Sequence, residues 1–111
     1  MSIVIHVENI FTRLTEAGVT DVPKRQYEIH DVDDFKVNFN FNVKTASIWI
    51  KTFDIDKPSK PLYVQIATFY PRGCSWTAVP RTDEWMSKFV RLLEATEALI
   101  VKEYQDGKSD S

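Results

Sequence analysis

The sequence is poor in cysteine and glycine, with one cysteine, Cys74, and three glycines among 111 residues. A single thiol excludes an intramolecular disulfide and is typical of proteins in a reducing compartment. No apolar stretch approaches the roughly 20 residues that a membrane-spanning helix needs. The first residues lack the basic start of a secretory signal, and Glu8 and Arg13 interrupt the apolar residues there. These absences predict a soluble, cytoplasmic protein.

An excess of one charge is also missing. Lys and Arg number 14, Asp and Glu number 16, and the formal net charge is −2. Such a balance favours neither attraction to nucleic-acid phosphates nor mimicry of DNA. The hydrophobic content of 43% is sufficient for one core. We therefore expect a single α+β domain over residues 1–104, followed by a flexible polar tail over residues 105–111.

Residues 35–53 carry the clearest pattern, that of a β-hairpin. Polar residues alternate with Phe35, Val37, Phe39, Phe41 and Val43, which is the period of a half-buried strand. A two-residue turn at Lys44-Thr45 would place Val43 opposite Ala46 and Phe41 opposite Ile48. A longer loop is the alternative, because Lys-Thr lacks the Asn-Gly or Gly that tight hairpin turns prefer.

Two helices are predicted, one on each side of the strands. The first spans residues 2–17, with apolar residues at helical spacing, and ends at Gly18 so that Val19 packs back on its last turn. A short strand at the β-branched residues 3–5 is the alternative. The second helix spans residues 83–104 and begins with acidic residues after Thr82. Its apolar stripe consists of Trp85, Phe89, Leu92, Leu93, Leu99 and Ile100.

Further strands are predicted at residues 25–30, 62–70 and 74–79. The fold is then an antiparallel β-meander of four to five strands, with the N-terminal and C-terminal helices packed on one face. In the strand 62–70 we expect two alternating sets. One set faces the helices and consists of Leu62, Val64, Ile66 and Thr68. The other faces away and consists of Tyr63, Gln65, Ala67 and Phe69.

The sheet face turned away from the helices is the predicted binding site. Asparagine is depleted in strands, so alternate asparagines indicate a hydrogen-bonding surface. The rings of Trp49, Tyr63 and Phe69 would add an amphipathic patch of the kind enriched at interfaces. The alternative is an ordinary solvated face whose rings pack across strands. The predicted binding residues are Lys36, Asn38, Asn40, Asn42, Trp49, Lys51, Tyr63, Gln65 and Phe69.

The function expected from this face is that of a small non-catalytic binding protein. It would act as an inhibitor, an adaptor or a host modulator such as phages encode, on a protein partner or as a homodimer. Two acidic loops, at residues 31–34 and 54–56, would contribute. The first alternative is nucleic-acid binding by the same aromatic face, which the charge balance disfavours. The order of elements resembles a double-stranded-RNA-binding domain in outline only, because residues 82–88 form no basic cluster.

The second alternative is an enzyme that uses Cys74. A nucleophilic cysteine needs a base within hydrogen-bond reach, and the sequence brings neither His6 nor His30 beside it. A packed strand cysteine is therefore favoured. The cluster of His30 with the acidic residues 31–34 lacks the glycine and the distal glutamate of a calcium loop, and no second cluster has zinc spacing. We therefore expect no metal and no cofactor.

Overall fold

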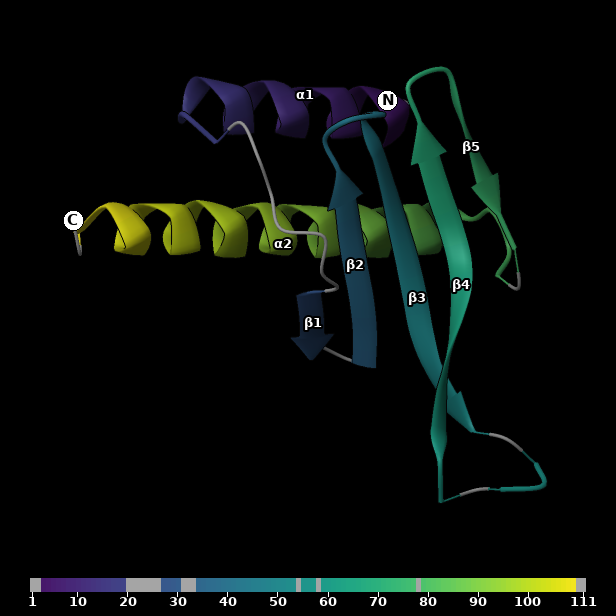
Figure 1. Cartoon of the computed structure of the whole chain (residues 1–111). Coiled ribbons are helices and arrows are strands. Elements are labelled where there is room, and N and C mark those ends of the chain that lie inside the picture. Colours follow the sequence, from purple (N-terminus) through teal and green to yellow (C-terminus); the bar gives the residue numbers. More distant parts are fainter. Residues whose placement is uncertain are drawn as a thin grey trace.

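A computed structural model describes residues 3–19, 27–30, 34–53, 55–57, 59–77 and 79–109. The elements, in chain order, are α1 (Ile3–Glu16), β1 (Tyr27–His30), β2 (Asp34–Asn40), β3 (Thr45–Phe53), β4 (Pro61–Tyr70), β5 (Gly73–Trp76) and α2 (Asp83–Ser109). The strands form one antiparallel sheet in the order β1-β2-β3-β4-β5. Both helices lie side by side on one face of this sheet (Figure 1). The predicted α+β fold is confirmed.

Helix α1 follows the predicted pattern closely. Ile3, Val7, Ile10, Phe11 and Leu14 are all buried, so the alternative of a strand at residues 3–5 is wrong. The predicted end is confirmed as well. Gly18 has a φ of 91°, and the Val19 N–H donates to the Leu14 carbonyl at 2.9 Å, which folds the buried Val19 back onto the helix. Gly18 is needed there because a Cβ at this φ is strained.

A bidentate ion pair joins the two helices. Arg13 Nη2 donates to Glu97 Oε1 at 2.7 Å, and Arg13 Nε donates to Glu97 Oε2 at 2.9 Å. These hydrogen bonds raise the pKa of Arg13 above its ordinary value. The pair joins the last turn of α1 to the middle of α2, and the two helices run in the same direction along the sheet (Figure 1).

Helix α2 is longer than predicted. It continues to Ser109, so residues 105–109, which were expected to belong to a polar tail, are helical. Tyr104 supports this extension, because its ring packs against the core and its hydroxyl lies beside Gly18. Glu103 Oε2 also accepts a hydrogen bond from the Tyr27 hydroxyl at 3.1 Å, which fastens α2 to β1. The contacts of Glu103 and Tyr104 therefore hold α2 in place just before its last residues, which continue the helix.

The β2–β3 turn has the longer loop, and the register expected from a two-residue turn is wrong. Val37 lies opposite Ile48 and Phe39 opposite Ala46, which leaves residues 41–44 as the turn. The Asn40 side-chain oxygen accepts from the Asn42 N–H at 3.0 Å, and Lys44 takes a φ of 54°. This local hydrogen bond stabilises the wider turn. The shift spans an even number of residues, so Phe35, Val37 and Phe39 still face the helices. Val43 was expected on the same face, but it lies in the turn and is 55% exposed.

A β-bulge in β4 changes which side chains face the helices. Ile48 pairs with Ala67 and Trp49 with Gln65, so Ile66 is an extra residue in β4. After the bulge the alternation is reversed, and Ile66, Ala67 and Phe69 are all buried. The prediction that Ala67 and Phe69 face away from the helices is therefore wrong, and so is the prediction that Thr68 faces them. Before the bulge, Tyr63 and Gln65 face away as predicted.

The helices cover only one part of the sheet. Under them, Phe11 packs edge-on against Phe39 at 5.4 Å between centroids, and Phe69 packs similarly against Phe89 at 5.9 Å. The far ends of β3 and β4 project beyond both helices (Figure 1). We call this projection the arm; it consists of residues 50–53 and 61–65 with the described loop residues 55–57 and 59–60. On the arm, Leu62 is 46% and Val64 is 42% exposed.

Candidate functional site

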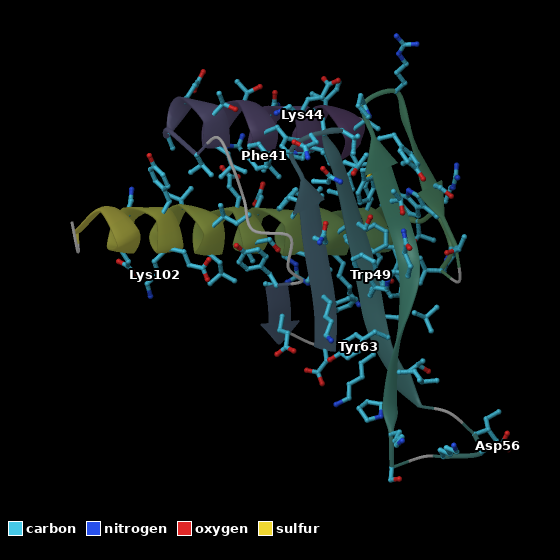
Figure 2. All side chains as sticks on the ribbon, viewed as in Figure 1. Phe41, Lys44, Trp49, Asp56, Tyr63 and Lys102 are labelled. Carbon is cyan, nitrogen blue, oxygen red and sulfur yellow. The ribbon has the colours of Figure 1, made fainter. Side chains whose placement is uncertain are left out.

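The sheet face opposite the helices, which we call the outer face, carries most of the predicted binding residues. The pairing of β2, β3 and β4 sets Lys36, Trp49 and Gln65 in one row across three strands. The next row contains Asp34 together with Lys51 and Tyr63 of the arm. Trp49 and Tyr63 come from the neighbouring strands β3 and β4 (Figure 2). Both rings are only partly buried, so they are accessible from solvent on this face.

Lys36 and Tyr63 interact across the strand that carries Trp49. The Lys36 ammonium lies 4.0 Å from the centroid of the Tyr63 ring, so it makes a cation–π contact from β2 to β4. Lys36 is also directly opposite Trp49 in the register. The register and this contact therefore bring the lysine and the two aromatic residues together on the outer face, with the ammonium group over the Tyr63 ring. We call Lys36, Trp49 and Tyr63 the aromatic patch.

The polar residues around the aromatic patch are held by neighbours on the same face. Lys51 Nζ donates to Asp34 Oδ2 at 3.1 Å, in a pair whose two side chains are about one third exposed. The Gln65 amide donates to the Thr68 hydroxyl on the same strand. These contacts reduce the number of rotamers that a partner would have to immobilise. The aromatic patch therefore has a pre-organised polar rim.

Two of the predicted binding residues lie elsewhere. Phe69 is buried in the core, since the bulge at Ile66 turns it toward α2. Asn42 lies in the exposed β2–β3 turn and not opposite Ser47, because the observed register ends the strand at Asn40. Asn40 pairs with Thr45, and its side chain stabilises the turn. Asn38 is on the outer face as predicted, but it lies opposite Ser47 and not opposite Lys51, its partner in the two-residue-turn register.

A groove that sequence reasoning missed lies beside α1. It is a groove of about 500 Å³ between α1 and the β2–β3 and β4–β5 turns, with an apolar lining that includes Val7, Phe11 and Tyr70. The Lys44 ammonium reaches over this groove, 5.3 Å from the Phe11 centroid and 4.8 Å from the Phe41 centroid. No sequence pattern indicated this groove, because the residues that line it are brought together by the paths of the β2–β3 and β4–β5 turns.

The candidates for catalysis do not form a catalytic constellation among the described residues. Cys74 is partly buried on β5 opposite Phe69. His6 lies on α1, beside a small hollow that it shares with Asp83 at the start of α2. Within the described ranges, no three His, Cys, Asp or Glu side chains are grouped as metal ligands would be. Residues 31–33 of the predicted acidic loop lie outside these ranges, while Asp34 pairs with Lys51.

Neither helix has, over its described residues, a stretch that is both long and apolar enough to span a membrane. The aromatic patch and its polar rim have the composition of an interface and are our candidate binding site. Searches against protein-family models, curated proteins and solved structures gave no match, so the assignment of this site depends on its geometry alone.

Proposed function

We propose that this protein is a small non-catalytic binding module that docks another protein on its outer face. The single observation that carries the proposal is the position of Trp49, a partly exposed tryptophan on the sheet face that neither helix covers (Figure 2). Tryptophan and tyrosine dominate the binding energy of protein interfaces when a polar rim surrounds them. Here Tyr63 and Lys36 extend the apolar surface, and Asp34, Lys51 and Gln65 supply the rim.

The charges of this face favour a protein over a nucleic acid. Its two central cations are already engaged, since Lys51 pairs with Asp34 and Lys36 lies over the Tyr63 ring. Binding to a phosphate backbone draws its free energy from cations that release counterions, and many such contacts are needed. The partner that fits is therefore a protein surface with an apolar pocket for Trp49, surrounded by amide and hydroxyl groups.

The loop at the end of the arm is a weaker candidate for the same partner. It was expected to be acidic, but among its described residues Asp56 stands between Ile55 and Lys57 and the loop also contains Lys60. Asp56 lies at the far end of the arm, well away from Trp49 (Figure 2). We therefore place binding on the outer face and assign this loop no part in it. An inhibitor or adaptor that acts in the cytoplasm is the cellular role consistent with this proposal.

A photoreactive residue at position 47 tests the proposal in the native host. Ser47 lies on β3 opposite Asn38, on the outer face and two residues from Trp49. Light should couple the protein covalently to one dominant protein, which mass spectrometry identifies. Binding of the purified partner is then measured by calorimetry. We expect Trp49→Ala to lower the affinity about 30-fold or more, which corresponds to the ~2 kcal/mol of an interface hot spot.

Tyr70→Ala is the matched control. Tyr70 is another exposed tyrosine of β4, but it lies beside the groove at α1 and outside the aromatic patch. This variant should bind the partner as the wild type does. Equal affinities for the wild type and Trp49→Ala would refute the proposal. Coupling to nucleic acid instead of protein would replace it with the nucleic-acid alternative, whose affinity must fall steeply with added salt.

A further inference from the structure

The β4 strand has an edge that is only half covered by β5. Residues 67–70 of β4 pair with β5, and the Thr77 N–H donates to the Ile66 carbonyl at 2.8 Å. Toward the arm, the last contact from this side is the Thr77 hydroxyl, which donates to the Gln65 carbonyl at 3.0 Å. No described strand pairs with residues 61–64 along this edge. The arm therefore presents a short open edge next to exposed Leu62 and Val64.

No charged side chain interrupts this open edge. Natural sheets protect exposed edges with lysines, inward charges, prolines, bulges or a covering loop, and here Lys60 and Pro61 on one side and the bulge at Ile66 on the other leave only the residues between them open to pairing. The segment Pro61-Leu62-Tyr63-Val64-Gln65 contains no charged residue, and Pro61 stands only at its start. A two-stranded ribbon with apolar side chains on both faces is also only marginally stable in water. Such a segment is suited to further strand pairing.

We infer that a second copy of this chain pairs with the open edge, so that two β4 strands join antiparallel about a two-fold axis at Tyr63. This inference goes beyond the proposed function, because it uses the backbone of the sheet edge, although Tyr63 at the axis also contributes its side chain to the aromatic patch. The joined strands would turn two five-stranded sheets into one continuous sheet. An antiparallel pair of identical strands is self-complementary, as the interface of a symmetric dimer must be.

The backbone groups match this register. The Gln65 carbonyl points to the side of β5, and alternation then directs the backbone groups of Tyr63 and the carbonyl of Pro61 to the same side. Tyr63 and its copy exchange two hydrogen bonds at the axis, and each Gln65 N–H donates to the Pro61 carbonyl of the other copy. The reverse bond is not needed, since Pro61 has no N–H and the Gln65 carbonyl is already bonded to Thr77.

The side chains match it as well. Pairing about Tyr63 places Leu62 of each copy beside Val64 of the other, on the face of the arm that the helices leave uncovered. These two residues are 46% and 42% exposed in the single chain. Strand β4 begins at Pro61, so the second copy's strand ends before it would reach β5. Edge length, hydrogen bonds and apolar side chains thus agree on one register.

Sedimentation velocity with charge-exchanged variants tests this dimer. The interface is small, so we expect the wild type to be a 12.9 kDa monomer at about 1 µM and to approach twice that mass at several hundred µM. The double variant Leu62→Lys, Val64→Lys and the double variant Leu62→Glu, Val64→Glu should each remain monomeric, because like charges then oppose each other. An equimolar mixture of the two should dimerise again.

Two controls separate this interface from other surfaces. Val43→Lys changes an exposed valine in the β2–β3 turn and should leave the dimer unchanged. Trp49→Ala should also leave it unchanged, whereas the double variants should still bind the partner of the outer face. A wild type that stays monomeric at several hundred µM would overturn the inference. Folded double variants that fail to associate when mixed, or loss of the dimer in Trp49→Ala, would overturn it too.

Hydrogen exchange gives a second, local measurement on the unmodified chain. The Tyr63 and Gln65 amides should exchange at least about tenfold more slowly at high protein concentration, because both donate across the dimer. The Lys57 amide, in the exposed loop of the arm, should exchange at one rate throughout. Dimerisation without this protection at Tyr63 would show that the copies meet on another surface.

Discussion

The two ends of β4 are both rich in apolar residues but have opposite surroundings. Ile66, Ala67 and Phe69 are almost completely buried, whereas Leu62 and Val64, a few residues earlier, are nearly half exposed. The difference comes from coverage, since Phe69 packs against Phe89 of α2 while the arm projects past both helices (Figure 1). Alternation in a sequence therefore predicts which side chains share a face, but it does not predict whether anything lies on that face.

The same contrast holds for the aromatic rings. Phe89 of α2 contacts three rings, those of Phe69, Trp76 and Trp85, within 6 Å of its own centroid. Trp49 and Tyr63 lie on the outer face, where Tyr63 is contacted by the Lys36 ammonium. Rings of the first kind hold the domain together, and rings of the second kind are available to a partner. Substitutions of the buried rings should therefore lower stability, whereas substitutions of Trp49 and Tyr63 should lower the affinity for a partner.

The largest effect is expected at the covered end. Phe69→Ala removes a fully buried ring next to Phe89, and it should lower the free energy of unfolding by about 3–5 kcal/mol. Urea denaturation followed by far-UV circular dichroism measures this change. Val64→Ala is the comparison on the arm, and it should lower the free energy of unfolding by less than about 1 kcal/mol, since little apolar area is buried there. Similar losses in both variants would contradict the comparison.

The contrast between covered and uncovered parts of the sheet also explains which parts of the fold can be predicted from the sequence. The inward faces of α1, β2 and β3 were predictable, because burial on one side imprints a period of 3.6 or 2 on the apolar residues. Trp49 and Tyr63 were placed on the outer face for the same reason. The bulge at Ile66 was not predictable, because Gln65-Ile66-Ala67 contains no glycine or other signal of an extra residue. The bulge then moved Phe69 out of the predicted site and into the core.

The β2–β3 turn and the C-terminal end of α2 could not be predicted from the sequence for a different reason. The β2–β3 turn depends on a side-chain hydrogen bond from Asn40 and on the left-handed conformation of Lys44, which are local choices that apolar patterns do not record. The last turns of α2 follow contacts of Tyr104 and Glu103 with distant parts of the chain. The groove beside α1 depends on both turns, so it could not be found before their paths were known.

An intermediate effect is expected at Gly18, which ends α1 beside Tyr104. Gly18→Ala places a Cβ 3.1 Å from the Tyr104 hydroxyl at a φ of 91°, so the variant should lose about 1–3 kcal/mol of stability. Gly73→Ala is the matched control, because a Cβ at Gly73 meets nothing within 4 Å. Thermal unfolding should show a lower midpoint for the first variant and a change of at most about 0.5 kcal/mol for the second. Equal midpoints for the two variants would show that a side chain at position 18 causes no strain.

A smaller effect is expected at the ion pair that joins the helices. Arg13→Gln should lower the free energy of unfolding by about 0.2–1 kcal/mol, since the arginine is nearly half exposed, and added salt should shrink the difference from the wild type. The pKa of Arg13 is higher in the folded state than in the unfolded state. The ion pair therefore stabilises the fold fully below the unfolded-state pKa, and this stabilisation is lost only as the pH rises through the folded-state pKa. Both values lie far above neutrality, so the arginine's titration adds no slope between about pH 6 and about pH 9. A difference that varied over this range would contradict the assignment.

The smallest effect is expected on the arm, where the comparison is sharpest. Leu62→Thr replaces an exposed leucine with a polar residue of high strand propensity, so the stability of the dilute monomer should change by no more than about 0.5 kcal/mol. Differential scanning fluorimetry at about 1 µM measures this. At several hundred µM the same variant should become less stable than the wild type, because the exposed leucine then contributes to the dimer. A loss of stability at both concentrations would mean that Leu62 packs within its own chain, and the arm would then be part of the core.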